Sequence, residues 1–376
     1  MAGLKTTVER LRDRIALAIG KTESAPVFSF ETVLLILSFV YGGVMRLRAR
    51  LYTAGILPSR SLPCRVISIG NITAGGTGKT PMTIMVARLI REMGYRVVVI
   101  SRGYRGRLEA TGGIVSDGET IFLGPEDAGD EPSLMARVLK GIPVLVGRRR
   151  YETGMLAVKR FNPDVIVLDD AFQHMGLKRD LNLVLLDSRL PFGNGYLLPR
   201  GLLREPVSSL CRADVVAFTR SEPFALSDKP KGLPAQKTMV RTLHKPLIRK
   251  IALRAGPFLT HVTDMSELHG KRALAFAGLA DNEQFFASLE QAGCVLEKTI
   301  SFPDHYRYGE KELERLVETA EENGVNLLIT TFKDYIKIQN WGAPINLAVI
   351  DVTIQLVGNE DTFRNLISEI LPPKKA

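Results

Sequence analysis

The stretch from Ser68 to Thr83, SIGNITAGGTGKTPMT, constrains the fold of this chain more than any other. Its end, Gly78-Lys79-Thr80, matches the end of the phosphate-binding loop G-x-x-x-x-G-K-[ST], but Thr73 stands where the first glycine belongs. An apolar, β-branched segment (64–72) precedes the loop, and a segment with helical spacing (81–94) follows it. This order of strand, glycine-rich loop and helix is typical of a βαβ unit in a parallel sheet.

The residue types of the loop fit a bound triphosphate. Gly75, Gly76 and Gly78 allow backbone N–H groups to turn inward, and the following helix points its positive end at the same phosphates. Lys79 is predicted to reach the β- and γ-phosphates, and Thr80 to place its hydroxyl on Mg²⁺. A glycine-rich turn without a ligand is the alternative. The residues expected to bind ATP are Thr73, Ala74, Gly75, Gly76, Thr77, Gly78, Lys79 and Thr80.

A second motif supports the first. The segment DVIVLDDAFQH (164–174) ends a hydrophobic strand in Asp169-Asp170. This is the position of the acidic residue that holds Mg²⁺, directly or through water, in P-loop enzymes. The pattern does not decide which of the two carboxylates contacts the metal.

Phosphoryl transfer also needs a group that takes the proton of the acceptor, and two segments offer one. EDAGDEPSL, which we expect to be a loop, carries Asp127, Asp130 and Glu131. SFPDHYRY carries Asp304 and His305, and a carboxylate beside a histidine is a common way to set a base near neutral pH. The alternatives are solvated loop acids and a purely structural Asp-His pair.

The charge of the chain, +10 from 50 basic and 40 acidic residues, suggests an anionic partner, either nucleic acid or an acidic membrane surface. We expect no nucleic-acid partner, because the basic residues are dispersed and no recognition motif is present. Cys64, Cys211 and Cys294 lie far apart without metal-ligand spacing, which is typical of reduced residues in a cytosolic protein.

An apolar run of 14 residues, Thr32 to Met45, lies near the N-terminus and is followed by Arg46, Arg48 and Arg50. A helix that crosses a bilayer needs roughly 20 residues. A buried core helix is one interpretation. We favour the other, a helix in the membrane interface whose arginines lie among lipid phosphates.

Six motifs occur in the order found in the tetraacyldisaccharide 4'-kinases, the lipid A kinases of Gram-negative bacteria. They are GNITAGGTGKTP, SRGY, GDEP, DDAFQH, LLPRGLLREP and FPDHYRY. The combination is very specific and spans roughly residues 30–340, so the chain resembles this family. The family carries threonine at the unusual first position of the loop, which makes Thr73 a family trait.

The resemblance implies transfer of the ATP γ-phosphate to the 4'-hydroxyl of a tetraacylated glucosamine disaccharide 1-phosphate, the lipid A precursor. The catalytic residues would be Lys79, Asp130 and His305: Asp130 would accept the 4'-OH proton, and His305, brought by a second lobe, would orient and tune it. The chain would be a monomer that rests on the cytoplasmic side of the cell inner membrane.

The resemblance also implies the remaining site residues. Thr80, Asp169, Asp170, Gln173 and Glu205 would lie near Mg²⁺, and Glu131, His174 and Arg204 would contact substrate or phosphate. Two positions depart from the family. Phe332 replaces the acid of the TTEKD motif, although Lys333 and Asp334 remain, and Tyr306 stands where a second histidine is often found.

Further apolar strands after the loop complete the expected fold class. We expect an α/β protein: a P-loop NTPase-like, mostly parallel sheet with helices on both faces, a second smaller α/β domain and an N-terminal membrane-associated helix. A cleft between the two lobes would hold the ligands. The expected units are 1–50, an N-terminal membrane-associating segment; 51–224, a P-loop kinase domain; 225–257, a linker region rich in Pro, Lys and Arg; and 258–376, a smaller C-terminal α/β domain.

Two rival functions stay open. A membrane-associated partitioning ATPase has a loop of the form K-G-G-x-G-K-[ST], but Ala74 occupies the position of its signature lysine. A membrane-bound scaffold that keeps a nucleotide for stability would not need Lys79, Thr80 and Asp169 intact. Consumption of ATP that ignores the lipid would favour the ATPase, and absence of turnover would favour the scaffold.

Overall fold

The computed structural model describes residues 19, 29–221, 232–233, 237–252, 263–358 and 360–373. Within them, twelve strands form one sheet in the order β10-β9-β11-β12-β8-β7-β6-β1-β5-β2-β4-β3. The strands are β1 (Arg65–Asn71), β2 (Val97–Ser101), β3 (Gly113–Ser116), β4 (Val144–Val146), β5 (Val165–Leu168), β6 (Leu181–Asp187), β7 (Val215–Thr219), β8 (Thr238–Ala252), β9 (Arg272–Ala277), β10 (Val295–Ser301), β11 (Leu327–Thr331) and β12 (Asn346–Val357).

The α-helices are α2 (Phe30–Thr53), α3 (Lys79–Glu92), α4 (Pro125–Ala128), α5 (Asp130–Val138), α6 (Arg150–Phe161), α7 (Asn282–Gln291), α8 (Glu310–Glu322), α9 (Phe332–Tyr335) and α10 (Glu360–Ile370). Two 3₁₀ helices, η1 (Val207–Arg212) and η2 (Met265–Leu268), complete the regular structure of the described residues.

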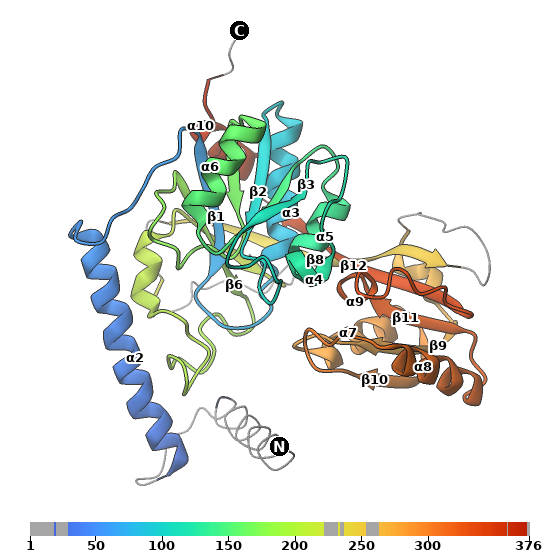
Figure 1. Ribbon diagram of the computed structural model, residues 1–376. Coiled ribbons are helices and arrows are strands. Elements are labelled where there is room, and N and C mark those ends of the chain that lie inside the picture. The colour runs from blue at the N-terminus through green and yellow to red at the C-terminus, as the bar shows by residue number, and fades with distance from the viewer. Residues whose placement is uncertain are drawn as a thin grey trace.

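The N-terminal part of the sheet is parallel from β7 through β6, β1, β5 and β2 to β4, and only the edge strand β3 is antiparallel. Helices lie on both of its faces (Figure 1). Its central strands are buried almost throughout, as the near-continuous Val, Ile and Leu runs predict. The α/β fold class is therefore confirmed. The parallel order places the C-terminal ends of β1 and β5 at one edge of the sheet, beside each other.

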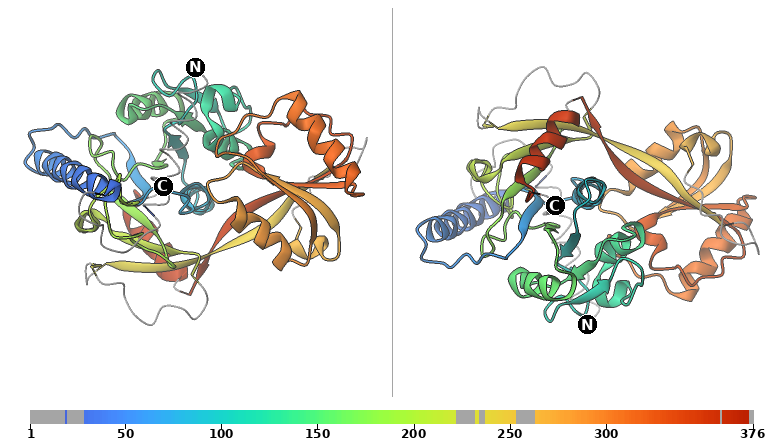
Figure 2. Two further views of the ribbon diagram at one scale, coloured as in Figure 1. Left: turned by 90° about the horizontal axis from the view of Figure 1, so that it is seen from below. Right: turned by 90° about the horizontal axis from the view of Figure 1, so that it is seen from above.

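Two long strands, β8 and β12, connect this part to the C-terminal part (Figure 2). β8 is parallel to β7 and antiparallel to β12, with a register from Leu347↔Ala252 to Val357↔Arg241. Most of the expected linker 225–257 that the structure describes is thus a strand, and residues 222–231, 234–236 and 253–262 lie outside the described ones. A single hydrophobic cluster includes residues of both parts, from Ile67 to Phe276 and Phe363.

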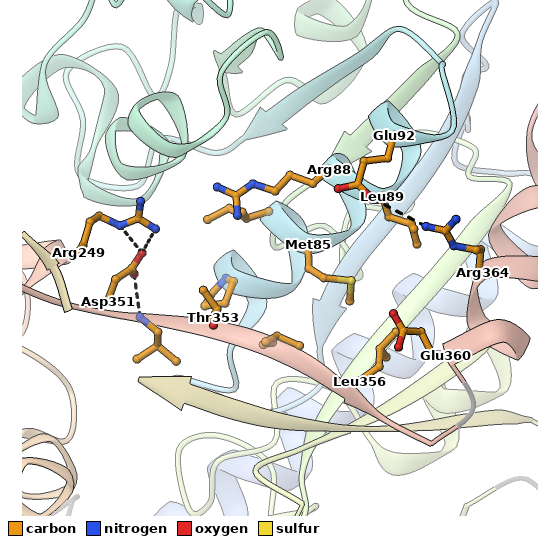
Figure 3. Close-up of a pocket in the computed structure, with 14 residues that line it drawn as sticks. Met85, Arg88, Leu89, Glu92, Arg249, Asp351, Thr353, Leu356, Glu360 and Arg364 are labelled. Carbon is orange, nitrogen blue, oxygen red and sulfur yellow. Dashed lines mark hydrogen bonds and ion pairs between the residues drawn. The ribbon is translucent and has the colours of Figure 1, made fainter. Parts of the chain in front are cut away.

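After β12 the chain returns to the N-terminal part through α10. Phe363 is buried, and Tyr95 Oη donates to the carbonyl oxygen of Pro372 at 3.0 Å. A groove of about 220 Å³ lies between α3, β12 and α10 (Figure 3). Arg249 Nε of β8 lies 2.7 Å from a carboxylate oxygen of Asp351 at one end of it. None of the predicted site residues lines this groove.

The apolar run near the N-terminus belongs to a longer helix than expected. α2 has 24 residues, because the arginine-containing segment after Met45 continues the helix, as good helix formers do. By length and composition it is long and apolar enough to cross a membrane. One side of it packs on the protein: Ser38 is buried, and its hydroxyl donates to the carbonyl oxygen of Leu197 at 2.7 Å.

The segment EDAGDEPSL is not the loop that we expected, because Asp130 and Glu131 open helix α5. Gly129 precedes them with φ of 89°, and a Cβ atom there would come within 2.8 Å of the carbonyl oxygen of Tyr104. Glycine is therefore required at this turn. Pro132 fits the first helical turn, where the backbone has no need of its N–H.

Candidate active site

The phosphate-binding loop lies between β1 and α3, as the motif predicts. Gly78 has φ of 84°, and a Cβ atom there would lie 2.5 Å from His244 Nε2 of β8, so only glycine fits. Asn71 Nδ2 donates to the hydroxyl of Thr77 at 2.8 Å, and the backbone N–H of Ala74 donates to the carbonyl oxygen of Leu202 at 2.7 Å. The loop is thus fixed at both ends by the protein itself.

Asp170 connects the loop to the segment that carries Arg204. Lys79 Nζ lies 3.7 Å from Asp170 Oδ1, and Arg204 Nη1 lies 3.1 Å from Asp170 Oδ2. Burial alone would raise the pKa of Asp170, but Lys79 and Arg204 hold it below its usual value. A cation pair on an ionised carboxylate at the start of α3 is a ready site for phosphate oxygens.

Asp169 is buried, with 1% of its surface exposed. Its carboxylate oxygens accept hydrogen bonds from the hydroxyls of Thr83 and Ser101, each at 3.0 Å. Burial, with the charges of Glu131 and Asp170, raises the pKa of Asp169 to about 7. Such a carboxylate is costly to ionise unless a cation comes near it.

A bound Mg²⁺ would offset the cost of ionising Asp169, so the buried carboxylate fits a metal site. Asp169 and Asp170 supply carboxylate oxygens, the donors that Mg²⁺ prefers when phosphates supply the rest. Thr80, which would add its hydroxyl, follows Lys79, whose ammonium lies 3.7 Å from Asp170 Oδ1. Gln173 and Glu205 are already engaged: Gln173 Nε2 donates to the carbonyl oxygen of Asn71 at 2.7 Å, and Glu205, 3% exposed, is paired with a neighbouring guanidinium. Among the described residues, no group of three or more His, Cys, Asp or Glu side chains lies close enough together to hold a metal ion without other ligands.

Asp130 and His305 are brought together across the two parts of the molecule. His305 Nδ1 lies 2.9 Å from Asp130 Oδ2. Burial alone would raise the pKa of Asp130, but the hydrogen bond from His305 and the charge of Lys337 hold it below its usual range. An ionised carboxylate only accepts hydrogen bonds, so Nδ1 carries the hydrogen and Nε2 is left as the basic nitrogen.

Electrostatics connects this pair with the phosphate loop. Glu131, next to Asp130 in α5, is the charged group that raises the pKa of Asp169 most, after burial itself, and it also acts on Lys333. Lys333 Nζ in turn lies 2.8 Å from Asp304 Oδ1. GDEP and FPDHYRY are therefore in direct contact through Asp130 and His305, and Glu131 of GDEP acts electrostatically on Asp169 of DDAFQH.

His174 is half-buried and close to several guanidinium groups. Burial, with the charges of Arg150, Arg179 and Arg48, lowers its pKa to about 4. Its imidazole is therefore neutral at physiological pH and suits hydrogen bonding better than anion pairing.

The departure at Phe332 does not touch the site. The ring is buried and lies 4.9 Å from the guanidinium carbon of Arg249, on the strand that connects the two parts. The site face of α9 carries Lys333 and Asp334 instead. The ring centroid of Tyr306 lies 4.7 Å from that of Phe302.

Substitution of Asp169 by asparagine is expected to stabilise the metal-free protein while it impairs turnover. The raised pKa means that the folded protein binds this proton more tightly than the unfolded chain, so the free energy of unfolding falls as the pH rises from about 4 to about 7. Asp169→Asn removes this loss. We expect about 1–3 kcal/mol of extra stability at pH 8 and little difference near pH 4.

Thermal unfolding at both pH values in a chelating buffer measures the effect. Ser101→Ala is the matched control, because it keeps the carboxylate and removes one of its donors, and it should lower stability at pH 8. A lower melting temperature of Asp169→Asn at pH 8 would contradict the buried-charge account.

Sequence reasoning missed several residues of the site. Thr83 and Ser101 hold Asp169, Arg150 donates to its carbonyl oxygen at 3.3 Å, and Lys337 lies 3.4 Å from Asp130. Ser101 begins the SRGY motif at the C-terminal end of β2, and that position was the available signal. Lys337 has no local signal except its spacing of three residues from Asp334.

Comparisons with known proteins agree with one another. A family model described as tetraacyldisaccharide-1-P 4'-kinase matches residues 30–372. The chain is 43% identical over 328 residues to the tetraacyldisaccharide 4'-kinase of Desulfatibacillum aliphaticivorans. The matched region covers 86% of this chain and 88% of that protein. It is 46% identical over 310 residues to the enzyme of the same name from Geobacter metallireducens, and this match covers 81% of this chain and 88% of that enzyme.

Among solved structures, the chain is similar to the "apo" form of LpxK from Aquifex aeolicus in complex with ATP. The TM-score is 0.73 at 30% sequence identity, and the match covers 92% of this chain and 100% of the other. The likeness therefore includes both parts of the sheet and the strands that join them.

Proposed function

The chain belongs to the tetraacyldisaccharide 4'-kinase family, and on this premise we propose how it transfers the γ-phosphate of ATP to the 4'-hydroxyl of the tetraacyldisaccharide 1-phosphate precursor of lipid A. The observation that supports the mechanism is the 2.9 Å contact between Asp130 and His305, which would supply an acid–base pair for the transfer.

The sequence hypothesis gave the acceptor's proton to Asp130, but the geometry favours the opposite assignment of roles. Asp130 is held ionised by His305 and Lys337 and is a weak base with a lowered pKa. Its carboxylate fixes Nδ1–H of His305, which leaves the Nε2 lone pair to accept the proton, as in other carboxylate–histidine pairs. Asp130 then stabilises the imidazolium that forms.

The transfer itself exchanges two bonds at phosphorus. The 4'-oxygen bonds to the γ-phosphorus, the bond to the β–γ bridging oxygen breaks, the hydroxyl proton moves to Nε2 of His305, and ADP leaves. Lys79 and Arg204 neutralise charge on the phosphates, and the N-terminus of α3 adds its dipole. Mg²⁺, held by Thr80 with Asp169 or Asp170, would supply further charge neutralisation there.

The test of this function is direct. Purified protein with ATP, Mg²⁺ and the lipid disaccharide 1-phosphate should give a doubly phosphorylated lipid, detected by mass spectrometry. ATP hydrolysis that proceeds at one rate with or without lipid would favour the partitioning ATPase. Nucleotide binding without any turnover would favour the scaffold.

The membrane association proposed for the chain rests on α2. Its side away from the protein exposes seven apolar side chains: Val33, Ile36, Leu37, Phe39, Val40, Val44 and Leu47. Tyr41 Oη donates to the carbonyl oxygen of Arg204 at 2.8 Å, so the helix is fixed to the segment that carries a phosphate-site arginine. A lipid headgroup beside α2 would thus be close to the site. Because ATP is a cytoplasmic substrate, we assign α2 to the cytoplasmic side of the inner membrane.

Replacement of Ile36 and Val40 by aspartate is expected to weaken membrane binding by about tenfold or more, because each apolar side chain withdrawn from lipid loses roughly 1.5 kcal/mol or more. Co-sedimentation with vesicles that contain anionic phospholipid measures it. Phe122→Asp is the matched control, since Phe122 is as exposed, at 56%, but lies far from α2 in the chain. Equal sedimentation of all three proteins would refute the role of α2.

A further inference from the structure

Lys337 is a buried ammonium that contacts two carboxylates. Only 7% of its side chain is exposed, and Nζ lies 3.4 Å from Asp130 Oδ2 and 3.0 Å from Asp334 Oδ1. Asp334 is fully buried and also accepts from the backbone N–H of Gly278 at 3.0 Å and the hydroxyl of Thr331 at 2.7 Å. A buried carboxylate whose two oxygens both accept hydrogen bonds or ion pairs has a fixed position, because leaving these partners would expose an unpaired charge to an apolar environment.

The TTFKD motif, which the proposed mechanism does not use, supplies Asp334, the carboxylate that holds Lys337. Thr331 Oγ1 accepts from the backbone N–H of Asp334 at 3.1 Å and thereby starts the short helix α9. From this helix, Asp334 holds Lys337 against Asp130, and Lys333 holds Asp304, whose Oδ2 lies 3.7 Å from His305 Nε2. The segment that carries Lys333 and Lys337 thus places one ammonium group beside Asp130 and another beside Asp304, the neighbour of His305.

The same segment forms the contact between the two parts of the molecule. Lys337 meets the first residue of α5, Asp130, and Gln339 Oε1 accepts from Nε of Arg137, near the end of α5, at 3.1 Å. Asp130 belongs to the N-terminal part, whereas His305 and Lys337 belong to the C-terminal part. The position of the Asp130 carboxylate therefore depends on this contact.

We propose that Lys337, held by Asp334, is a positioning residue that fixes the Asp130 carboxylate against His305 through its own ion pair across the contact with α5. This inference rests on the proposed kinase function and names a residue on which its chemistry depends. Lys337 does not touch the reacting atoms, and it acts through Asp130.

The surrounding charges support this role. Asp130 faces the ring of His305 and the ammonium groups of Lys337 and Lys333. Lys337 faces Asp130, Asp334 and the ring of Tyr308, whose centroid is 5.8 Å away. Burial alone would raise the pKa of Asp130, and these partners hold it below its usual value. Removal of one of these cations would therefore make the Asp130 carboxylate easier to protonate.

The test compares Lys337→Met, which keeps the length and removes the charge, with Lys337→Arg, which keeps the charge. In Lys337→Met we expect kcat to fall about tenfold or more, with the KM for ATP and lipid changed by less than about threefold. The acid limb of the kcat–pH profile should move to higher pH, because the Asp130 carboxylate then takes a proton more easily. Lys337→Arg should recover most of kcat and the original profile.

Two controls separate positioning from simple folding or docking. The double variant Lys337→Met/Asp334→Asn removes both buried charges, so it should fold with a melting temperature near that of the parent yet stay slow with the shifted profile. Gln339→Ala loosens the other end of the α5 contact and should keep the parental profile. The proposal is overturned if the double variant regains parental kcat and pH dependence, or if Gln339→Ala reproduces both the loss and the shift.

A second readout does not depend on lipid turnover. In the protein loaded with ATP and Mg²⁺, the NMR signals of the His305 ring should change in Lys337→Met and stay unchanged in Gln339→Ala. Unchanged signals in both variants would overturn the proposal for Lys337. Failure of the parent protein to phosphorylate the lipid would instead overturn the proposed function, and the NMR comparison would still decide whether Lys337 positions the pair.

Discussion

Lys79→Ala is expected to lower kcat for lipid phosphorylation by about 10²–10³-fold, the usual loss when one preorganised charge on a transition state is removed. Lys79 opens α3, and its ammonium lies 3.7 Å from Asp170 Oδ1, at the edge where the phosphates would lie. Steady-state kinetics with saturating ATP and lipid measures the change. The affinity for ATP should fall much less, because backbone amides and Mg²⁺ still hold the phosphates.

The fold should survive this substitution, because Asp170 keeps its contact with Arg204. Arg91→Ala is the matched control: it removes a cation from the same helix, three turns away, and should leave kcat unchanged. If Lys79→Ala retains near-parental turnover, the loop between β1 and α3 does not hold the transferred phosphate. An equal loss in Arg91→Ala would point to damage of α3 rather than to a missing charge.

The nucleotide half of the site was predictable because its signals are local. A β-branched strand, glycines and a helix follow one another within SIGNITAGGTGKTPMT, and the structure gives β1, a glycine loop and α3 there. The hydrophobic strand that ends in Asp169-Asp170 is likewise a single run of sequence. The parallel sheet order then places both C-terminal ends side by side, as general rules for such sheets require.

The elements that the sequence did not reveal have mixed local signals. β8 carries Arg241, His244, Lys245 and Pro246, which obscure strand alternation, and its stability comes from the ladder with β12. Gly129 precedes α5 and Pro132 lies in its first turn, and both residue types are typical of loops. In both cases the tertiary context overrides local propensity.

The contact of Asp130 with His305 joins residues 175 positions apart and has no local signal at all. In the sequence, only the resemblance to a family, carried by the order of several motifs, pairs them. Which of the two takes the proton needed atomic detail, because it depends on which ring nitrogen faces the carboxylate. The sequence likewise gives no signal for the role of Lys337, because its two carboxylate partners meet only in the folded protein.

Asp130→Asn is expected to lower kcat by about 10²-fold or more, a typical contribution of a general acid–base pair, with a smaller change in the KM for the lipid. Asparagine keeps the shape and can still accept from Nδ1–H of His305, but it no longer stabilises the imidazolium. His305→Ala should cost at least as much, because it removes the group that takes the proton. The double variant should be no slower than His305→Ala alone, since residues that act as one unit are strongly non-additive.

Asp127→Asn provides the matched control for this series. Asp127 lies in α4, three positions before Asp130, and its carboxylate is 3.7 Å from a guanidinium nitrogen of Arg107 in an exposed pair. Because exposed ion pairs contribute little, its loss should leave kcat and stability nearly unchanged. A rise in lipid KM with kcat preserved in Asp130→Asn would make Asp130 a binding group. Losses that simply multiply in the double variant would mean that Asp130 and His305 act independently, and proton transfer would then need a different acceptor.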